Sequence, residues 1–489
     1  MRLEHLARHF VVDDQFLNVK GVALCRRVDG GEYGGGELQM REVLRQRLLH
    51  NGRDHFFEHV GFLLSGSEID VGADEAGVVG LADHLGDLDL TAHLLSKFYR
   101  NWRLYSCFSL SLQEKEMIKR IIKDSILADY KRRKVIVLLG ARQVGKTTLL
   151  SELQEGKEKV LSLNCDNTDD VLLLEGRTTT ELEHLLSPYK LVFIDEAQRV
   201  KNIGLTLKMI GDLKLKTQVV VTGSSSLDMA DEINEPATGR LIEYNLFPFS
   251  LTELAGNSSD REEHRLLENR MIYGLYPEVV TEPGDAKRTL MSLTNNYLYK
   301  DLFAYKGIKK PELIQKLVRA LALQLGSEVS YNELSNLLGV DKSTVENYIN
   351  LLEKCFVVFR LDSFSRNLRN EIKKGKKIYF YDNGVRNAVL SNFAPLELRN
   401  DVGALWENLM VSERVKRNSY SGNFAQFFFW RTHEQQEIDL IEEQDGVLHT
   451  FEFKWNGKAR NSQPRAFANS YPTSTYEVIT PDNYWSFVK

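Results

Sequence analysis

Cysteine, net charge and long apolar runs are all scarce in this chain of 489 residues, and each scarcity excludes a class of protein. The four cysteines, Cys25, Cys107, Cys165 and Cys355, lie far apart, so they form neither a disulfide framework nor a metal knuckle, which suits a reducing cytoplasm. No apolar run approaches the ~18 residues of a membrane span, and the N-terminus does not have the pattern of a signal peptide. The net charge of −5 indicates no particular partner. We expect a cytoplasmic protein without a membrane partner.

Residues 1–112 differ in composition from the rest of the chain. The first 110 residues hold two lysines against ten arginines, seven of the 11 histidines and 13 of the 33 glycines. His55 and His59 have the i, i+4 spacing of two metal ligands, but no third ligand is evident. Two interpretations stay open: an accessory domain, or sequence upstream of a natural start at Met117, where an amphipathic helix begins. We favour the second.

The most informative stretch is residues 135–150, VIVLLGARQVGKTTLL. An apolar strand pattern ends in Gly140, and Gly145, Lys146 and Thr147 follow at the spacing of a phosphate-binding loop (G-x-x-x-x-G-K-T). Glycines let the backbone wrap a polyphosphate, Lys146 reaches the β and γ phosphates, and the Thr147 hydroxyl ligates Mg²⁺. A chance glycine-rich turn would not explain the strand before and the helix after. The residues expected to bind ATP are Gly140, Ala141, Arg142, Gln143, Val144, Gly145, Lys146, Thr147 and Thr148.

Two further apolar strands end in polar side chains that complete such a site. Residues 191–196, LVFIDE, end in Asp195, expected to hold Mg²⁺ through water, and Glu196, expected to act as the general base. Residues 218–225 end in hydroxyls, and either Thr222 or Ser224 could sense the γ-phosphate. Strands alternate with helices from residue 134 to 245, which indicates a parallel sheet with helices on both faces. A strand lies between the phosphate loop and the acidic strand, the arrangement of ATPases with an extra catalytic glutamate.

Arg240 lies at a glycine turn just before the predicted strand 241–245. It is a candidate arginine finger, acting on the γ-phosphate in cis or from a neighbouring subunit of a homo-oligomer. An ordinary surface arginine explains it equally well.

Residues 311–361 have the pattern of a winged helix. A helix from Pro311, a second that begins at the capping box Ser330–Glu333 and a third over 342–353 precede an apolar strand over 356–361. Seven cations follow closely, which favours DNA as the partner over a protein-contact module. These cations are Arg360, Arg366, Arg369, Lys373, Lys374, Lys376 and Lys377.

Residues 437–454 predict a hairpin around Asp445-Gly446, a two-residue turn. Its register places Asp439 opposite Glu452 and puts Lys454 on the same face. The two acids could bind Mg²⁺, Lys454 could activate a water for attack on a phosphodiester, and Glu407, on a predicted helix, could be a further ligand. An ordinary hairpin with cross-strand ion pairs is the alternative.

From about residue 117 to the end, the sequence resembles bacterial and archaeal AAA-type ATPases fused to an uncharacterised C-terminal region. The resemblance rests on stretches 140–147, 194–198, 222–225, 239–240, 274–278, 379–384, 406–408, 437–439 and 452–454. It implies a cytoplasmic ATPase whose winged helix precedes a restriction-endonuclease-like domain of the PD-(D/E)XK type.

We expect an α/β chain with a P-loop NTPase of the AAA (ASCE) type, a winged helix and a nuclease-like domain. The boundaries expected are 113–248 for the ATPase core, 249–310 for a helical lid or linker, 311–362 for the winged helix and 363–489 for the nuclease-like domain. The expected function is ATP hydrolysis coupled to action on DNA. The alternative is a nucleotide-dependent switch with an inactive C-terminal domain.

Overall fold

The computed structural model describes residues 117–223, 239–298, 311–365, 375–432, 434, 436–456 and 462–489. The chain divides into two compact units, residues 1–115 and 116–489. The interpretations of residues 1–112 and the position of Ser224 lie outside the described residues. Within the described part of the chain, no helix combines the length and the apolarity that a membrane span requires.

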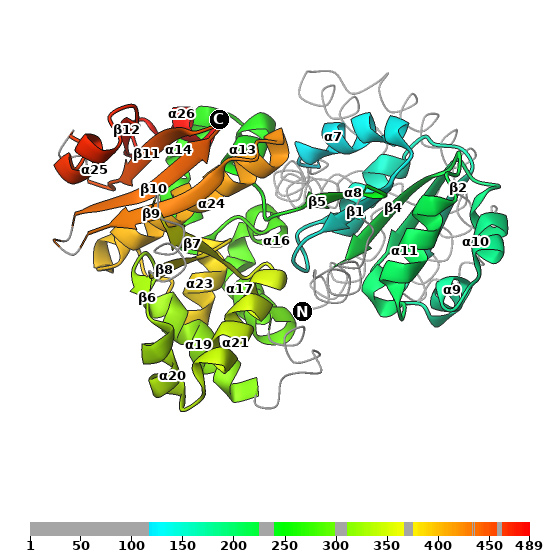
Figure 1. Cartoon of the computed structure of the whole chain (residues 1–489), viewed down its shortest axis with the longest axis horizontal. Helices are drawn as coiled ribbons and strands as arrows, with labels where there is room; N and C mark the ends of the chain where they lie inside the picture. Colours follow the sequence, from blue (N-terminus) through cyan, green and yellow to red (C-terminus); the bar gives the residue numbers. More distant parts are fainter. Residues whose placement is uncertain are drawn as a thin grey trace, which may run out of the picture. The chain divides into compact units, whose positions relative to one another are not determined.

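Five parallel strands form the first sheet of the second unit, as the sequence predicts. Their order is β2-β3-β4-β1-β5, and every neighbouring pair is parallel. Strand β4 therefore lies between β1, which precedes the phosphate loop, and β3, which carries the acids (Figure 1). The strands are β1 (Val135–Leu139), β2 (Val160–Asn164), β3 (Leu191–Asp195), β4 (Gln218–Gly223) and β5 (Leu241–Asn245).

Helices cover both faces of this sheet because successive residues of a strand point to opposite faces. Ile136 and Leu138 of β1 pack on the side of α7 and α8, whereas Val135 and Val137 pack on the side of α9, α10 and α11. All of β1 is buried, and each fully buried aliphatic side chain contributes about 1.5–3 kcal/mol. The helices are α7 (Ile122–Asp129), η2 (Tyr130–Arg132), α8 (Lys146–Gln154), α9 (Thr168–Leu174), α10 (Thr179–Leu186), η3 (Ala197–Arg199) and α11 (Ile203–Asp212).

Short helices follow β5, the first of them starting at the capping box formed by Ser250 and Glu253. They do not stand apart as a separate linker, because α15 and α17 pack against α23 (Asn383–Leu390) and α15 also contacts α24 (Val402–Ser421). The helices of this segment are α13 (Leu251–Asn257), α14 (Asp260–Arg265), α15 (Leu267–Tyr273), α16 (Pro277–Thr281), η4 (Pro283–Asp285), α17 (Ala286–Ser292) and η5 (Leu293–Leu298).

The stretches 274–278 and 379–384, on which the family resemblance rests in part, contact each other where these helices pack. Asp382 Oδ2 accepts a hydrogen bond from Leu275 N at 2.7 Å, while Oδ1 accepts one from Val385 N at 3.0 Å at the start of α23. Gly274 has a φ of 72°, and a Cβ there would lie 2.1 Å from Asp382 Oδ1. The stretches 274–278 and 379–384 therefore join α15 and α16 to α23, which is a packing role.

A second, mixed sheet has seven strands in the order β12-β11-β10-β9-β7-β8-β6. The boundary expected between 362 and 363 falls inside β7, whose last residues pair with Phe428 and Phe429 of β9, so one sheet crosses that boundary. The strands are β6 (Glu328–Val329), β7 (Val358–Ser363), β8 (Lys376–Phe380), β9 (Gln426–Arg431), β10 (Glu437–Gln444), β11 (Val447–Phe453) and β12 (Thr475–Ile479).

The helix pair expected at 330–353 is present. Helix α19 (Pro311–Leu323) precedes β6, α20 (Tyr331–Leu338) ends at Gly339 with a φ of 64°, and α21 (Lys342–Lys354) follows. The predicted apolar face of α21 is buried. The strand after α21 is β7, two residues later than the sequence suggests.

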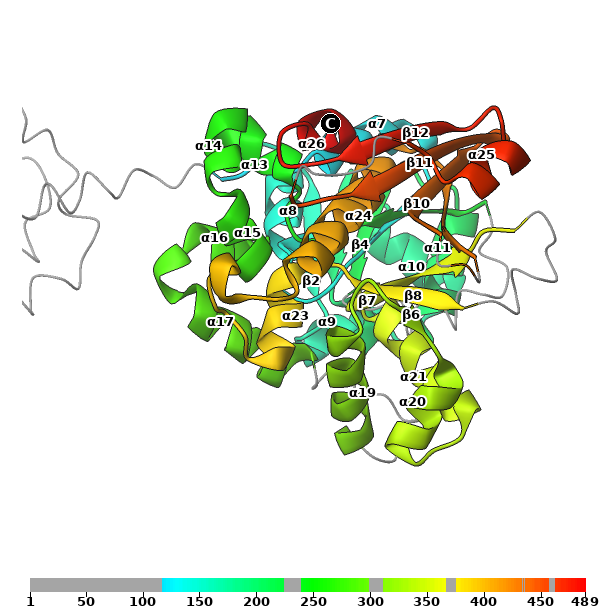
Figure 2. The same cartoon turned by 90° about the vertical axis from the view of Figure 1, so that its left-hand side faces the viewer.

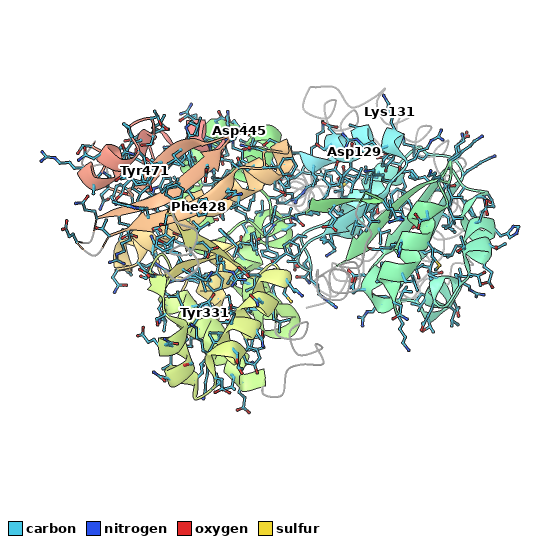
Figure 3. All side chains as sticks on the ribbon, in the orientation of Figure 1. Asp129, Lys131, Tyr331, Phe428, Asp445 and Tyr471 are labelled. Carbon is cyan, nitrogen blue, oxygen red and sulfur yellow. The ribbon has the colours of Figure 1, made fainter. Side chains whose placement is uncertain are left out.

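The predicted hairpin is confirmed in register. Leu440 faces Phe451, and Gln444 faces Val447, next to the turn. Asp445, labelled in Figure 3, has a φ of 52° and Gly446 a φ of 81°, and positive values at both positions are those of a type I′ turn. Helix α24 packs against β8 and β11 (Figure 2). The remaining helices are η6 (Leu396–Leu398), α25 (Arg465–Ser470) and α26 (Tyr484–Val488).

Candidate functional site

The phosphate-binding loop lies between β1 and α8. Gly145 has a φ of 95° and Gln143 a φ of 62°, so the chain turns through the left-handed region twice within three residues. Gly140 has no room for a side chain, because a Cβ there would lie 2.2 Å from the carbonyl oxygen of Leu246. Val144 is fully buried and anchors the loop in the core. The backbone of this loop is therefore fixed by packing as well as by its glycines.

Lys146 begins helix α8 and is 5% exposed. Its Nζ donates to the main-chain carbonyls of Gly140 at 3.0 Å and Ala141 at 2.9 Å, which holds the ammonium over the loop. The first turn of α8 contains no acidic residue, and its N–H groups point toward an anion placed at the helix N-terminus. Thr147 and Thr148 are exposed in the same turn. The site thus offers a cation and several amide donors to a polyphosphate.

Asp195, at the end of β3, joins the loop to β4. Thr147 Oγ1 donates to Asp195 Oδ2 at 2.8 Å, and Thr222 Oγ1 donates to Oδ1. Within the described residues no ion pair reaches Asp195. A carboxylate held by hydroxyls keeps its full negative charge for a cation. Thr147 and Asp195 are therefore suited to hold Mg²⁺, since this ion prefers oxygen ligands and commonly uses few protein groups beside substrate phosphates.

Thr222 also fixes the neighbouring acid. Its Oγ1 accepts a hydrogen bond from Glu196 N at 3.1 Å, so one fully buried hydroxyl links Asp195 with Glu196. Glu196 has a φ of 53°, which turns its side chain away from the strand direction, and Gln198 Nε2 donates to its carboxylate. The predicted roles of Asp195, Glu196 and Thr222 thus fall on residues that the structure brings together.

Arg240 lies beside the start of β1, at the opposite end of that strand from the phosphate loop, so its position does not favour the predicted action in cis. Val135 N donates to Arg240 O, and Val135 pairs with Leu241, so Arg240 stands beside the start of β1. The phosphate loop follows the end of β1, five residues on, or about 16 Å along a strand. The guanidinium forms an ion pair with Asp212 at the end of α11. Action from a neighbouring subunit stays a prediction.

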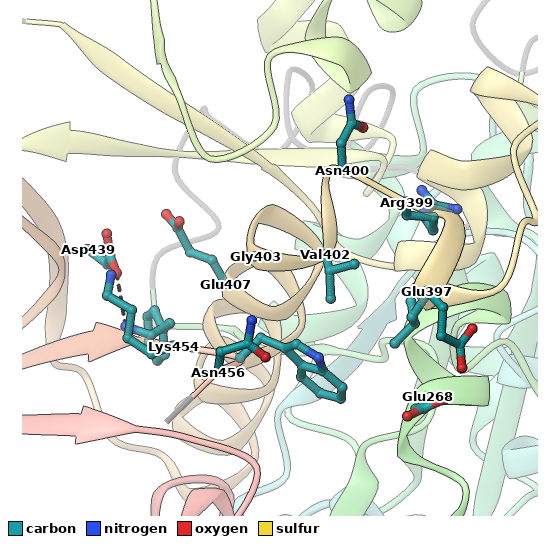
Figure 4. A pocket seen from close by; sticks show the side chains of 13 residues that line it. Glu268, Glu397, Arg399, Asn400, Val402, Gly403, Glu407, Asp439, Lys454 and Asn456 are labelled. Carbon is teal, nitrogen blue, oxygen red and sulfur yellow. Dashed lines mark hydrogen bonds between the residues drawn. The ribbon is translucent and has the colours of Figure 1, made fainter. Parts of the chain in front are cut away.

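The four predicted C-terminal residues gather in a second site. Glu407 on α24, Asp439 on β10 and Lys454 after β11 line a pocket of about 690 Å³ (Figure 4). Glu452 lies beside them: Lys454 Nζ contacts its Oε1 at 2.6 Å, while its buried Oε2 has no hydrogen-bond partner among the described residues. Asp439 Oδ2 accepts from Phe453 N at 2.9 Å.

Lys377, which sequence reasoning assigned to a DNA-facing basic run, lies at the centre of this second site. Its side chain is 1% exposed. Its Nζ lies 2.6 Å from Glu437 Oε1, 3.0 Å from Glu407 Oε1 and 3.8 Å from Asp439 Oδ1. Burial alone would lower the pKa of Lys377, but the negative charges around it raise this pKa well above its usual value. The ammonium is therefore charged and shared among carboxylates.

Tyr379 is the other residue that sequence reasoning missed. Its hydroxyl donates to Glu407 Oε1 at 2.6 Å. Burial, together with the charge of Asp439, raises the pKa of Glu407 to about 7. The sequence could have predicted that these two residues lie together, because positions 377 and 379 share one face of strand β8.

The predicted metal ligands Glu407, Asp439 and Glu452 stay a prediction, and two of them have the Lys377 ammonium as a neighbour. Within the described part of the chain, no group of three or more histidine, cysteine, aspartate or glutamate side chains is placed to hold a metal ion. Glu407 and Asp439 instead share the Lys377 ammonium.

Two other members of the basic run are also engaged within the fold. Arg360 forms an ion pair with Glu353 and donates to Asn350, and Lys376 forms one with Asp362. The remaining four, Arg366, Arg369, Lys373 and Lys374, lie outside the described residues. The described cations of this run are therefore each paired with an acid of the fold.

Three family models match parts of the chain. Residues 132–255 match an AAA domain, residues 264–396 a domain of unknown function (DUF8612) and residues 402–483 another domain of unknown function (DUF4143). The second match begins within α14 and covers α15 to α17 as well as the region expected to be a winged helix.

Curated relatives are uncharacterised proteins. One from Mycobacterium tuberculosis is 26% identical over 66% of this chain and 70% of its own length, and one from Haemophilus influenzae is 24% identical over 64% and 80%. Among solved structures, the Walker-type ATPase PABY2304 of Pyrococcus abyssi is 17% identical, with a TM-score of 0.39, over 56% of this chain and 97% of that one. Bacteroides Pif1 bound to ssDNA is 15% identical, with a TM-score of 0.20, over 32% and 50%.

The AAA match covers all five parallel strands and the phosphate loop described above. The chain thus carries an AAA-type P-loop ATPase domain, followed by a C-terminal domain of unknown function.

Proposed function

We propose that this chain binds ATP with Mg²⁺ at the loop between β1 and α8, hydrolyses it, and uses the cycle to act on DNA in the cytoplasm. One observation carries the hydrolytic part: Asp195 is held between the hydroxyls of Thr147 and Thr222, and Thr222 also holds the backbone of Glu196. This arrangement couples the predicted metal ligands to the predicted general base.

Each residue of the site has a distinct task in hydrolysis. Lys146 and the amides of the loop bind the phosphates and oppose the charge that builds on them. Bound Mg²⁺ would neutralise part of the same charge. Glu196 accepts the proton of the attacking water, and Thr222 keeps Glu196 and Asp195 in register. A second copy of the chain could supply Arg240.

The DNA part of the proposal rests on residues 311–380. The elements α19, β6, α20, α21, β7 and β8 follow in the order of a winged helix, with β8 pairing antiparallel to both β6 and β7. Helix α21 exposes Lys342, Ser343 and Asn347, side chains that suit phosphate and base edges. Glu346 lies on the same face and opposes phosphate.

The second candidate is a nucleotide-dependent switch that contacts protein. The internal pairing of Arg360, Lys376 and Lys377 favours it, because these cations are not offered to an external polyanion.

The two proposed functions can be distinguished by measuring the affinity for duplex DNA at several salt concentrations. With DNA as the partner, affinity for duplex falls steeply with salt, and Lys342→Ala reduces the slope by about 1. Lys316→Ala is the matched control, because Lys316 is an exposed lysine on α19 and does not belong to α21. If no binding occurs at low salt while ATP hydrolysis is intact, the chain is a switch. If wild type lacks Mg²⁺-dependent hydrolysis or Lys146→Ala retains it, the ATPase part is wrong.

A further inference from the structure

Lys377 occupies the position that a metal ion would take in the C-terminal carboxylate cluster, defined here as Glu407, Glu437 and Asp439. These acids come from α24 and β10, which are far apart in the sequence, and the ammonium from β8 lies between them. An ammonium is a compact cation with three hydrogen-bond donors, and this one lies within hydrogen-bond distance of both glutamates and 3.8 Å from Asp439 Oδ1.

One oxygen of each glutamate and one oxygen of Asp439 lie near that single ammonium. Glu437 Oε1 and Glu407 Oε1 lie 2.6 and 3.0 Å from Lys377 Nζ. Tyr379 donates to Glu407 as well, and Asp439 divides its two oxygens between Lys377 and the amide of Phe453. A divalent ion would bind carboxylate oxygens at about 2.0–2.6 Å, and charge repulsion from the buried ammonium beside those oxygens opposes its binding.

Glu452 is the observation that opposes this assignment. Its buried Oε2 has no hydrogen-bond partner among the described residues, as expected of an oxygen that awaits a ligand. Its other oxygen, however, is held by Lys454 at 2.6 Å, so Glu452 too is paired with an ammonium. The single unpaired oxygen of Glu452 is therefore weaker evidence for a metal site than the pairing of the other acids with Lys377 is against it.

We propose that the Lys377 ammonium is the resident cation of this cluster and takes the place of a divalent metal ion. The C-terminal domain then holds its acids in a metal-independent arrangement, and it does not cleave phosphodiesters by a metal-dependent route. This inference stands apart from ATP hydrolysis, which takes place at a different site.

The test is Mn²⁺ binding to the full-length chain, followed by electron paramagnetic resonance without nucleotide. Asp195→Asn is present in every protein, so that the ATP site contributes equally. The series consists of this parent, Asp439→Asn, Lys377→Met and the variant with both changes. Lys377→Arg is the matched control because it keeps the positive charge.

We expect the parent, Asp439→Asn and Lys377→Arg to bind the same amount of Mn²⁺. Lys377→Met should gain a Mn²⁺ site, and adding Asp439→Asn should remove it. Mn²⁺ should also raise the melting temperature of Lys377→Met but not that of the parent.

Two results overturn the proposal. One is Mn²⁺ binding by the parent that Asp439→Asn abolishes, since the metal then binds beside Lys377. The other is a folded Lys377→Met protein that gains no site. If circular dichroism shows that Lys377→Met does not fold, the comparison of parent with Asp439→Asn alone decides, because equal binding supports the proposal and unequal binding contradicts it.

Discussion

Asp195 and Asp439 are both buried aspartates, 9% and 6% exposed, yet their surroundings differ in kind. Asp195 is held by the hydroxyls of two threonines, whereas Asp439 shares an ammonium with two glutamates. Hydroxyls orient a carboxylate and leave its charge intact, while an ammonium cancels it. The partner of a buried acid, more than its burial, therefore decides whether the acid can bind a metal ion.

The two arrangements also differ in what their loss would cost. Removing one partner of a buried ion pair leaves an uncompensated charge and costs about 3–5 kcal/mol of stability. A hydrogen bond from a hydroxyl to a carboxylate is worth about 1.5–3 kcal/mol. Changes at the first site should therefore appear mainly in catalysis, and changes at the second mainly in stability.

The largest expected effect is that of Glu196→Gln on ATP hydrolysis. The carboxamide keeps the shape but cannot accept a proton, so turnover should fall by about 10²–10⁴-fold. Steady-state phosphate release measures this, and the affinity for a fluorescent ATP analogue is the control, expected to be unchanged. Normal turnover would show that Glu196 is not the general base.

Lys377→Met should lower the free energy of unfolding by about 3–5 kcal/mol, because it leaves Glu407, Glu437 and Asp439 without their positively charged partner. Lys454→Met is the matched comparison. Its side chain is 42% exposed, and such a pair is worth about 1 kcal/mol or less. Urea denaturation of both variants measures the difference. Equal losses would mean that the second site is not organised around Lys377.

Thr222→Val should slow ATP hydrolysis by about tenfold or more, since it removes a hydrogen bond worth about 1.5–3 kcal/mol to Asp195 and one of the two acceptors of Glu196 N. Thr222→Ser keeps the hydroxyl and should retain most of the rate. A valine variant as active as the serine variant would mean that the hydroxyl does not position these acids.

The smallest expected effect is that of Arg240→Ala in a monomeric preparation. Because Arg240 stands beside the start of β1 and pairs with Asp212, hydrolysis per chain should be unchanged, as it should for Asp212→Ala. A loss confined to Arg240→Ala in monomers would contradict this placement. If the chain assembles and hydrolysis falls, mixing Arg240→Ala with Lys146→Ala should restore part of it, which would assign the arginine to a neighbouring subunit.

The first site could be predicted because its parts are local. The strand, loop and helix from Val135 to Gln154 are contiguous in sequence, and the structure has the predicted strand before the loop and the predicted helix after it. The hairpin register around Asp445 was equally accessible, since a two-residue turn fixes which residues face each other.

The second site could be predicted only in part. Strand alternation separates Lys376 from Lys377, but it does not say which of them faces inward. That choice depends on Glu407 of α24 and on β10, which tertiary packing alone brings to β8. The position of Arg240 could have been found, because a parallel strand starting at Leu241 must begin at the edge opposite the phosphate loop.

The most direct test of this contrast is a count of tightly bound Mn²⁺ ions per wild-type chain in the presence of a non-hydrolysable ATP analogue. The account predicts one ion per chain, lost in Lys146→Ala together with the nucleotide and unaffected by Asp439→Asn. Two ions per chain, one of which disappears in Asp439→Asn, would contradict it.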